Sequence, residues 1–114
     1  MDDRLLQQLK KGVLEMLVLE IICQEATYGY ELMAKLKLRS GDLFSLKEGT
    51  LYPILYRLED DGMIVSSWSQ GEGKTAPKKI YTATEAGQAD RHRRYGVWET
   101  FYRTVNGFYQ EDTK

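Results

Sequence analysis

A segment near the middle of the chain combines an apolar helical stripe with side chains suited to contact DNA. Leu51, Leu55 and Leu58 are four and three positions apart, so they share one face of a helix. Other faces of the same segment carry Thr50, Tyr52, Pro53 and Arg57. Hydroxyl and guanidinium groups near the first turns of a helix meet phosphates and base edges when that helix enters a DNA groove. We therefore expect this helix to contact duplex DNA.

Two of these residues also have a purely structural interpretation. Thr50 would then cap the helix or fill space, and Tyr52 would lie at the edge of the core. Position along the helix does not separate the two interpretations. Pro53 fits both, because proline is tolerated near the first turn of a helix.

The start of this helix has two candidate positions. Ser45 followed three residues later by Glu48 has the form of a capping box. A start at Lys47 would instead place a cation at the mouth of the helix, where it suits a phosphate bound to the helix N-terminus. We expect Lys47 to contact DNA in that arrangement.

A β-hairpin is predicted to follow the helix. Residues 63–69 read as the first strand, and residues 78–83 read as the return strand with Ile80 pointing inward. The intervening loop, residues 70–77, contains two glycines and a proline. The loop and return strand carry Lys74, Lys78 and Lys79. Beside a DNA-reading helix these lysines would contact the flanking backbone or the minor groove; the alternative is an ordinary solvated charge run.

Two helices are predicted ahead of this unit. Residues 4–24 form the first, which is apolar on nearly every side in its second half and is therefore the central buried helix. Its first half carries a narrower apolar stripe that would meet a partner chain, made by Leu5, Leu6 and Leu9. The second helix covers residues 28–39, after a turn at residues 25–27 in which Thr27 is a candidate N-cap.

Two tyrosines flank a glycine at the start of the second helix. A helix N-terminus lying across a phosphate offers backbone N–H groups, and a tyrosine hydroxyl adds one hydrogen bond. We expect Tyr28 to contribute this bond and one residue of the pair to be core, with Tyr30 the weaker candidate for DNA contact.

The last helix, capped by Thr84 and covering residues 85–109, carries more aromatic surface than a cap needs. Its stripe consists of Tyr95, Trp98, Phe101, Tyr102, Val105, Phe108 and Tyr109. A small domain cannot cover a stripe this wide, so we expect a second copy of the chain to cover it; the alternative is an intrachain core. Trp98, with Tyr95 and Tyr102, is a candidate site for a flat aromatic effector, although ordinary interface packing explains the same residues.

Composition limits the remaining possibilities. The chain has 114 residues, enough for one domain, and carries a net charge of −1. Cys23 and His92 are single, so neither a disulfide nor a metal site is expected, and we expect neither a cofactor nor catalysis. No apolar run reaches membrane-spanning length and no signal-peptide pattern opens the sequence, which favours the cytoplasm.

Four segments occur in order: Lys11-Gly12 with Leu14-Glu15 and residues 17–19; residues 28–31; residues 49–53 with 57–59 and Gly62; and residues 79–81 with 84–87. Together they resemble the PadR family of bacterial transcriptional regulators over nearly the whole chain. The resemblance implies a winged helix-turn-helix homodimer that represses genes and often responds to small molecules. Lys47 departs from the family pattern, which more often has a short polar residue at that position.

The combined expectation is a mainly α fold with a small β-hairpin. Residues 1–83 would form a winged helix-turn-helix, and residues 84–114 a dimerisation helix. The homodimer would repress transcription from a palindromic operator in double-stranded DNA, with relief by a small hydrophobic or aromatic effector.

Two alternatives to this function remain at the level of sequence. The first is a winged-helix module for protein–protein contact, which the net charge of −1 favours because DNA-binding domains are usually basic. The second is a ligand-binding scaffold with only residual affinity for DNA.

Overall fold

The structure, a computed structural model, describes residues 3–71 and 73–110 of the chain. The element order is α1 (Asp3–Gln24), β1 (Thr27–Tyr28), α2 (Gly29–Arg39), α3 (Glu48–Asp60), β2 (Ile64–Trp68), β3 (Lys79–Ala83) and α4 (Glu85–Tyr109). The mainly α class with a small hairpin is therefore confirmed. The outer ends of the two expected segments, residues 1–2 and 111–114, lie outside the described residues.

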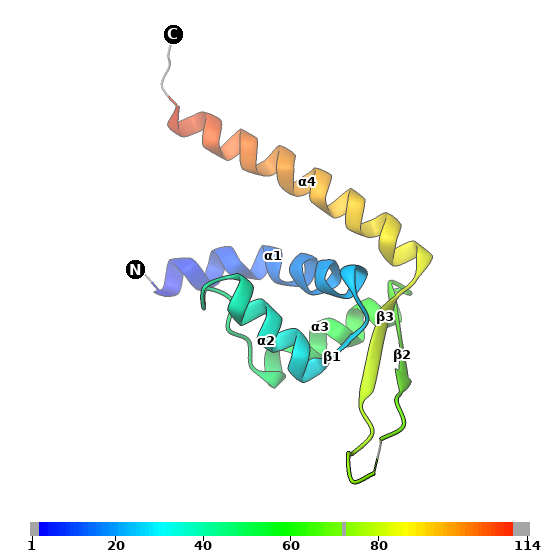
Figure 1. Ribbon diagram of the computed structural model, residues 1–114. Helices are drawn as coiled ribbons and strands as arrows, with labels where there is room; N and C mark the ends of the chain where they lie inside the picture. Colours follow the sequence, from blue (N-terminus) through cyan, green and yellow to red (C-terminus); the bar gives the residue numbers. More distant parts are fainter. Residues whose placement is uncertain (1–2, 72, 111–114) are drawn as a thin grey trace.

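Helices α1, α2 and α3 pack together, while the β2–β3 hairpin extends away from them and α4 diverges from α1 along its length (Figure 1). The second half of α1 is buried because it is apolar on nearly all sides, as expected. The core is completed by Leu32 and Leu36 of α2 and by Leu51, Ile54, Leu55 and Leu58 of α3. The leucine face of α3 is thus turned inward, and its other faces are left for contacts outside the core.

Helix α3 begins at Glu48, with Lys47 as its N-cap residue. The Lys47 carbonyl accepts hydrogen bonds from the amides of Thr50 and Leu51, both at 3.0 Å. Its side chain makes no capping hydrogen bond, and Ser45 lies outside the helix. The later of the two predicted starts is therefore correct, and the capping box is not formed.

The turn predicted at residues 25–27 is partly wrong, because Thr27 and Tyr28 form strand β1. This strand pairs antiparallel with β3, giving the sheet order β1-β3-β2. The Thr27 side chain is buried and its hydroxyl donates to Glu31 Oε1 at 2.6 Å, whereas Tyr28 occupies the N-cap position of α2. A two-residue strand has too short a pattern to be recognised without its partner strand.

The inward residue of β3 is Tyr81 rather than Ile80. Tyr81 is 1% exposed and pairs with Thr27 on one side and Ser66 on the other, while Ile80 is only half-buried. Both residues are apolar enough to face inward, and only the pairing register decides which of two successive side chains does so. Burial raises the pKa of the Tyr81 phenol to about 12.

Helix α4 is anchored at its first turn to the turn between α3 and β2. The Thr84 hydroxyl accepts from the Gly87 amide at 3.0 Å, as the predicted cap requires, and donates to the Gly62 carbonyl at 2.6 Å. A Cβ on Gly87 would lie 2.0 Å from the Met63 carbonyl oxygen. Only glycine allows the first turn of α4 to approach the Met63 carbonyl this closely, so the attachment of α4 to this turn depends on Gly87.

A Gly87→Ala substitution is expected to lower the free energy of unfolding by about 1–3 kcal/mol, the usual cost of overpacking a rigid site. Gly96→Ala is the matched control, because a Cβ there meets nothing within 4 Å on the same helix. The control should gain about 0.5–1 kcal/mol from helix propensity. Urea unfolding of both variants measures the difference, and equal effects would show that the Gly87 contact is unimportant.

Candidate nucleic-acid interface

The N-terminal end of α3 presents exposed polar groups. Lys47, Thr50 and Pro53 are exposed, whereas Leu51 beside them is buried in the core. Within the described residues, the side chains of Lys47 and Thr50 form no hydrogen bond or ion pair. Free N–H groups and the helix dipole make such an end attractive to anions, and Lys47 adds a full positive charge.

Tyr52 lies at the edge of the core, which is the structural interpretation weighed for it from sequence. Its side chain is half-buried and packs against the core, and its ring lies 6.3 Å from that of Tyr56 between centroids. Its hydroxyl reaches the first residue of α2, where a Cβ on Gly29 would lie only 2.6 Å away. Tyr52→Ala would thus remove packing as well as a hydroxyl, so Tyr52→Phe is the substitution that isolates the polar group.

The hairpin contacts Tyr28, the last residue of β1 and the N-cap of α2, through a cation–π interaction. Lys78 Nζ lies 4.3 Å from the centroid of the Tyr28 ring. Tyr28 is half-buried and Tyr30 is exposed, so the expectation that one of the pair belongs to the core is wrong. The structure thereby brings two of the predicted DNA-contacting residues, Tyr28 and Lys78, next to each other.

The other two lysines of the hairpin differ in their surroundings. Lys74 is exposed in the loop, while Lys79 is partly buried and its Nζ lies 5.7 Å from the centroid of the Tyr81 ring. Figure 1 shows the hairpin tip and the N-terminal ends of α2 and α3 extending away from α4. Lys47 is the N-cap residue of α3 and residues 74 and 78 precede β3, so these predicted cations lie on the side of the molecule away from α4 (Figure 1).

Sequence reasoning overlooked Trp68, at the end of β2. The register pairs it with Lys79, and its side chain is exposed. By the two-residue period of a strand it shares a face with Ser66, whose hydroxyl donates to Glu59 Oε2 of α3 at 2.6 Å. Trp68 therefore lies on the α3 side of the hairpin, beyond the core. Its position next to the lysine-bearing loop in the sequence was the feature that could have marked it as a candidate contact residue.

Arg57 is placed differently from Thr50. Its guanidinium binds the carboxylate of Glu15 on α1, with Nε and an Nη each about 3 Å from Oε1 (3.1 and 3.0 Å). Arg57 lies in the last turn of α3, near the acidic residues Asp60 and Asp61 and away from the exposed N-terminal end. The structure does not bring it together with the other candidate DNA contacts.

Charge is mixed at both ends of α3. Its N-terminal end carries Lys47 beside Glu48, and its C-terminal end carries Arg57 near the acidic residues 59–61. The N-terminal end of α3 therefore carries no net positive charge of its own, and the predicted basic surface depends on the lysines of the hairpin. In the part of the chain that is described, no group of three or more His, Cys, Asp or Glu side chains could hold a metal ion.

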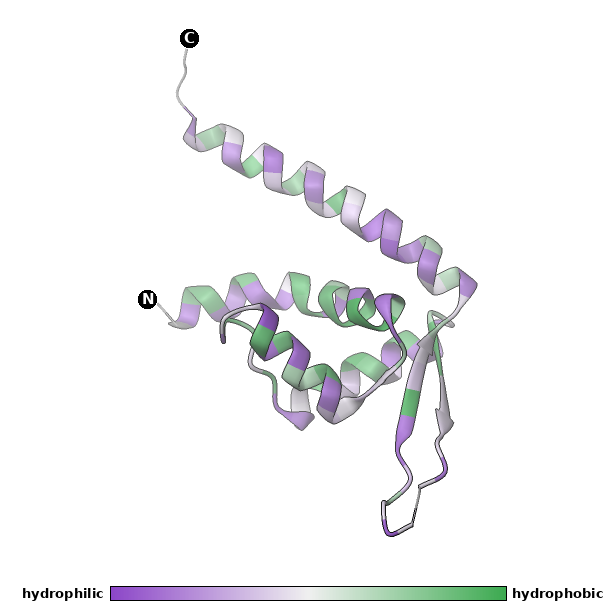
Figure 2. Cartoon of the chain, in the orientation of Figure 1, coloured by the Kyte–Doolittle hydropathy of each residue, from purple (hydrophilic) through white to green (hydrophobic). Residues whose placement is uncertain are grey.

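A second surface, on α4, is apolar and exposed. Seven large apolar side chains of this helix are exposed: Tyr95, Val97, Phe101, Tyr102, Val105, Phe108 and Tyr109. Figure 2 shows apolar positions recurring along α4 well beyond the part that lies near α1. Leu5 and Leu9 of α1 are exposed as well, and Leu6 is half-buried. The predicted dimerisation residues therefore lie on the N-terminal half of α1 and on α4, where the two helices diverge (Figure 1).

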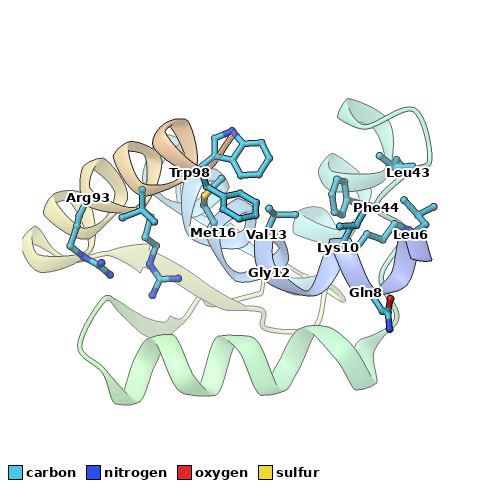
Figure 3. A pocket seen from close by; sticks show the side chains of 14 residues that line it. Leu6, Gln8, Lys10, Gly12, Val13, Met16, Leu43, Phe44, Arg93 and Trp98 are labelled. Carbon is cyan, nitrogen blue, oxygen red and sulfur yellow. The ribbon is translucent and has the colours of Figure 1, made fainter. Parts of the chain in front are cut away.

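A groove of about 840 Å³ lies between these diverging helices (Figure 3). Its apolar lining includes Leu6, Leu9, Met16, Phe44, Trp98 and Phe101. Trp98 is half-buried, and its ring lies 6.3 Å from that of Phe101 and 5.7 Å from that of Tyr102. Of the three residues predicted to hold an effector, Trp98 lines the groove, whereas Tyr95 and Tyr102 are not part of its lining.

Residues 18–93 match the profile of the Transcriptional regulator PadR-like family. The negative transcriptional regulator PadR of Bacillus subtilis is 30% identical over 70% of this chain, which spans 43% of that protein. The crystal structure of a PadR family transcriptional regulator from Eggerthella lenta matches with a TM-score of 0.83 at 29% identity, over 96% of this chain and 92% of that one. A PadR-like transcriptional regulator from Bacillus cereus matches with a TM-score of 0.78 at 34% identity, over 92% and 99% of the two chains. The expected winged helix-turn-helix with a long C-terminal helix is confirmed.

Thr50→Ala is expected to weaken binding to DNA selected by the wild-type protein by about 1–3 kcal/mol, the usual value of one specific contact. Its unfolding transition should not move, because the side chain is exposed and contacts nothing in the core. Thr82→Ala, on an exposed position of β3, is the control and should change neither quantity. A shifted unfolding midpoint with unchanged affinity would identify Thr50 as a structural residue.

Lys74→Gln is expected to reduce the slope of log affinity against log salt concentration by about one, because one phosphate contact is lost. The loss of affinity should be nearly equal for selected and random DNA, since Lys74 lies between the two strands and not on a helix or strand that would orient it toward a base. Fluorescence anisotropy at several salt concentrations measures both. A loss limited to one base position would instead show that Lys74 reads sequence.

Proposed function

Because the chain belongs to the PadR-like family of transcriptional regulators, we propose that it binds a palindromic operator in double-stranded DNA as a homodimer and represses transcription. One observation carries the proposal: the exposed N-terminal end of α3, with free Lys47 and Thr50, together with a lysine-bearing hairpin that contacts Tyr28 at the start of α2. In this proposal α3 enters the major groove, while Lys74, Lys78 and Lys79 contact the adjacent backbone. The family consists of transcriptional regulators, not enzymes, and a bacterial regulator of this kind acts in the cytoplasm, where the DNA lies.

Four further residues take supporting places in this interface. Tyr28 and Tyr52, beside the N-terminus of α2, offer hydroxyl groups to the phosphate backbone. Pro53 stiffens the exposed end of α3, since its ring fixes the backbone φ angle. Trp68 adds an apolar side chain that suits contact with sugars or base steps next to the lysines. Arg57 is left out of the contact set, because Glu15 already binds its guanidinium.

The homodimer is proposed from the unburied surface of α4. A helix of 25 residues is about 37 Å long at 1.5 Å per residue, and Arg91 and Arg94, within its first three turns, form ion pairs with α1. A second copy that packs its own α4 against the exposed part of this helix would bury both aromatic stripes around a two-fold axis. Two-fold symmetry would also place two α3 helices on half-sites about one helical turn apart.

This arrangement divides the chain into two parts by role. Residues 1–83 would form the DNA-binding domain, and residues 84–114 the dimerisation helix. Repression is supported by the Bacillus subtilis relative, which is a negative regulator. A bound dimer that covers a promoter needs no further chemistry to block transcription.

We also propose a small hydrophobic effector that stacks on Trp98. The support is the half-buried indole in the wall of the α1–α4 groove, with Phe101 beside it. Tyr95 and Tyr102 would belong to the dimer contact rather than to this site. An effector would change DNA binding only if it prefers one of two dimer shapes, since equal affinity for both shifts nothing.

Phe108→Glu is expected to convert the dimer into a folded monomer, because this side chain is 85% exposed and a buried carboxylate at the interface is costly. Leu38→Glu is the matched control, since Leu38 is 82% exposed but lies on α2. Sedimentation should give monomers for the first variant and dimers for the second. A Phe108→Glu protein that remains dimeric would contradict the proposed interface.

The same two variants test DNA binding against the alternative of a protein–protein module. The Leu38→Glu dimer should bind duplex DNA with an affinity that falls steeply as salt increases. The Phe108→Glu monomer should bind the same DNA much more weakly, because it contacts one half-site at a time. Absence of salt-dependent binding by the wild-type dimer would favour the protein–protein module.

The effector site can be observed through Trp98 alone in a Trp68→Phe variant, because the chain has two tryptophans. Flat aromatic compounds that bind in the groove are expected to quench this fluorescence and, over the same concentration range, to weaken operator binding by the wild-type protein. No quenching by a broad panel of such compounds would identify Trp98 as a packing residue.

A further inference from the structure

Glu15 of α1 binds arginines from two other helices at once. Its Oε1 accepts a hydrogen bond from Arg57 Nε of α3 at 3.1 Å and lies 3.0 Å from Arg57 Nη2 in the same ion pair, and its Oε2 accepts from Arg94 of α4 at 3.0 Å. The Glu15 side chain is 26% exposed and that of Arg94 is 20% exposed. One partly buried carboxylate thus connects the helix proposed to read DNA with the helix proposed to form the dimer.

The connection continues within α4. Arg94 also donates through Nε to Asp90 Oδ2 at 2.5 Å, and Arg93 donates to Asp90 Oδ1 at 2.9 Å. Burial alone would raise the pKa of Asp90, but the hydrogen bonds from Arg94 and Arg93 outweigh it and lower the pKa. Arg94 is therefore held in a fixed orientation by carboxylates on both sides, and the orientation of Glu15 follows that of α4.

A second carboxylate on α1 provides the comparison. Glu20 binds Arg91 of α4 through both oxygens, at 2.6 and 3.1 Å, and its side chain is 29% exposed. The hydrogen bonds from Arg91 lower its pKa, so it is charged near neutral pH. Glu20 matches Glu15 in helix, exposure and partner helix, but it has no contact with α3 among its hydrogen bonds and ion pairs in the described residues.

We propose that Glu15 is a positioning residue for DNA recognition: by holding Arg57 and Arg94 together it fixes the angle between α3 and α4. The inference rests on the proposed function, because this angle matters only in a dimer that binds two half-sites. In such a dimer, α4 defines the two-fold axis, so the angle sets the distance and rotation between the two α3 helices. One base pair of DNA corresponds to about 3.4 Å along the axis, so a loosened angle should relax the preferred spacing of half-sites.

The role assigned to Arg57 is part of the same proposal. The planar Arg57 guanidinium approaches Glu15 Oε1 with two of its nitrogens, whereas a lysine ammonium would offer a single nitrogen on a flexible stem. Arg57 acts on DNA through Glu15 and not by direct contact with phosphate. Its loss should therefore leave the affinity of a single half-site unchanged.

The test uses full-length wild type, Glu15→Gln and Glu20→Gln, with half-sites selected by the wild-type protein. Central spacings are changed by one and two base pairs, and affinities are measured by fluorescence anisotropy. For each protein, the affinity for the preferred spacing is divided by the affinity for the neighbouring spacings. This ratio should be about fivefold or more lower in Glu15→Gln than in wild type, because typical coupling between two sites changes an affinity by at least about fivefold. Glu20→Gln should keep the wild-type ratio, although it also breaks an ion pair between α1 and α4.

Two further variants separate positioning from stability and from direct contact. Arg57→Lys keeps the charge but loses the two-nitrogen geometry, so it should relax spacing as Glu15→Gln does even if the latter folds poorly. Arg57→Gln combined with Glu15→Gln should relax spacing no further than either change alone. If Arg57→Gln weakens a single half-site and lowers the salt slope, Arg57 contacts phosphate and the proposal is overturned.

The outcomes distinguish this inference from the function on which it rests. A wild-type protein that binds no DNA would contradict the proposed function. A wild-type protein with a sharp spacing preference that Glu15→Gln and Arg57→Lys both retain would overturn only the role of Glu15.

Discussion

The attachment of α4 to α1 is the interaction on which the rest of this structure depends. Glu15 and Glu20 hold Arg94 and Arg91, so the first three turns of α4 lie along the second half of α1. Beyond these ion pairs the two helices diverge, and the aromatic stripe of α4 extends past the domain (Figure 1). Attachment at one end of a long helix thus leaves an apolar surface that a single chain does not bury.

The start of α4 also positions the elements proposed to meet DNA. Thr84 and Gly87 fasten the start of α4 to the turn between α3 and β2, through the carbonyls of Gly62 and Met63. Strand β3 ends at Ala83 and α4 begins at Glu85, so Thr84 links the two elements. Its hydrogen bonds to the carbonyls of Gly62 and Met63 therefore join the base of the hairpin and the start of α4 to the turn that follows α3. A change in the direction of α4 would therefore act on both the hairpin and α3, with Glu15 as the side-chain link.

Local patterns were sufficient to predict much of this fold from sequence. The leucine spacing identified the buried face of α3, Thr84 identified the start of α4, and the Gly- and Pro-containing loop identified the hairpin. Each of these features depends on neighbours within about four residues. The family resemblance supplied what local patterns lack, namely the arrangement of these elements as a winged helix.

The features that sequence reasoning missed depend on contacts between distant residues. Strand β1 exists because Thr27 and Tyr28 pair with β3, and the same register turns Tyr81 inward in place of Ile80. The ion pair between Arg57 and Glu15 joins residues 42 positions apart, so no local pattern indicates it. For the interface, spacing along α3 located Thr50, but only the tertiary structure showed that Tyr52 is half-buried and that Trp68 is exposed beside Lys79.

The central claim is that a two-fold dimer of this chain reads duplex DNA with the N-terminal ends of two α3 helices. Sequencing of DNA selected by the purified protein from a random duplex pool tests it most directly. The account predicts an enriched inverted repeat whose half-sites are centred about one helical turn apart, or a multiple of it. Enrichment of a single unrepeated site, or no enrichment over the starting pool, would contradict it.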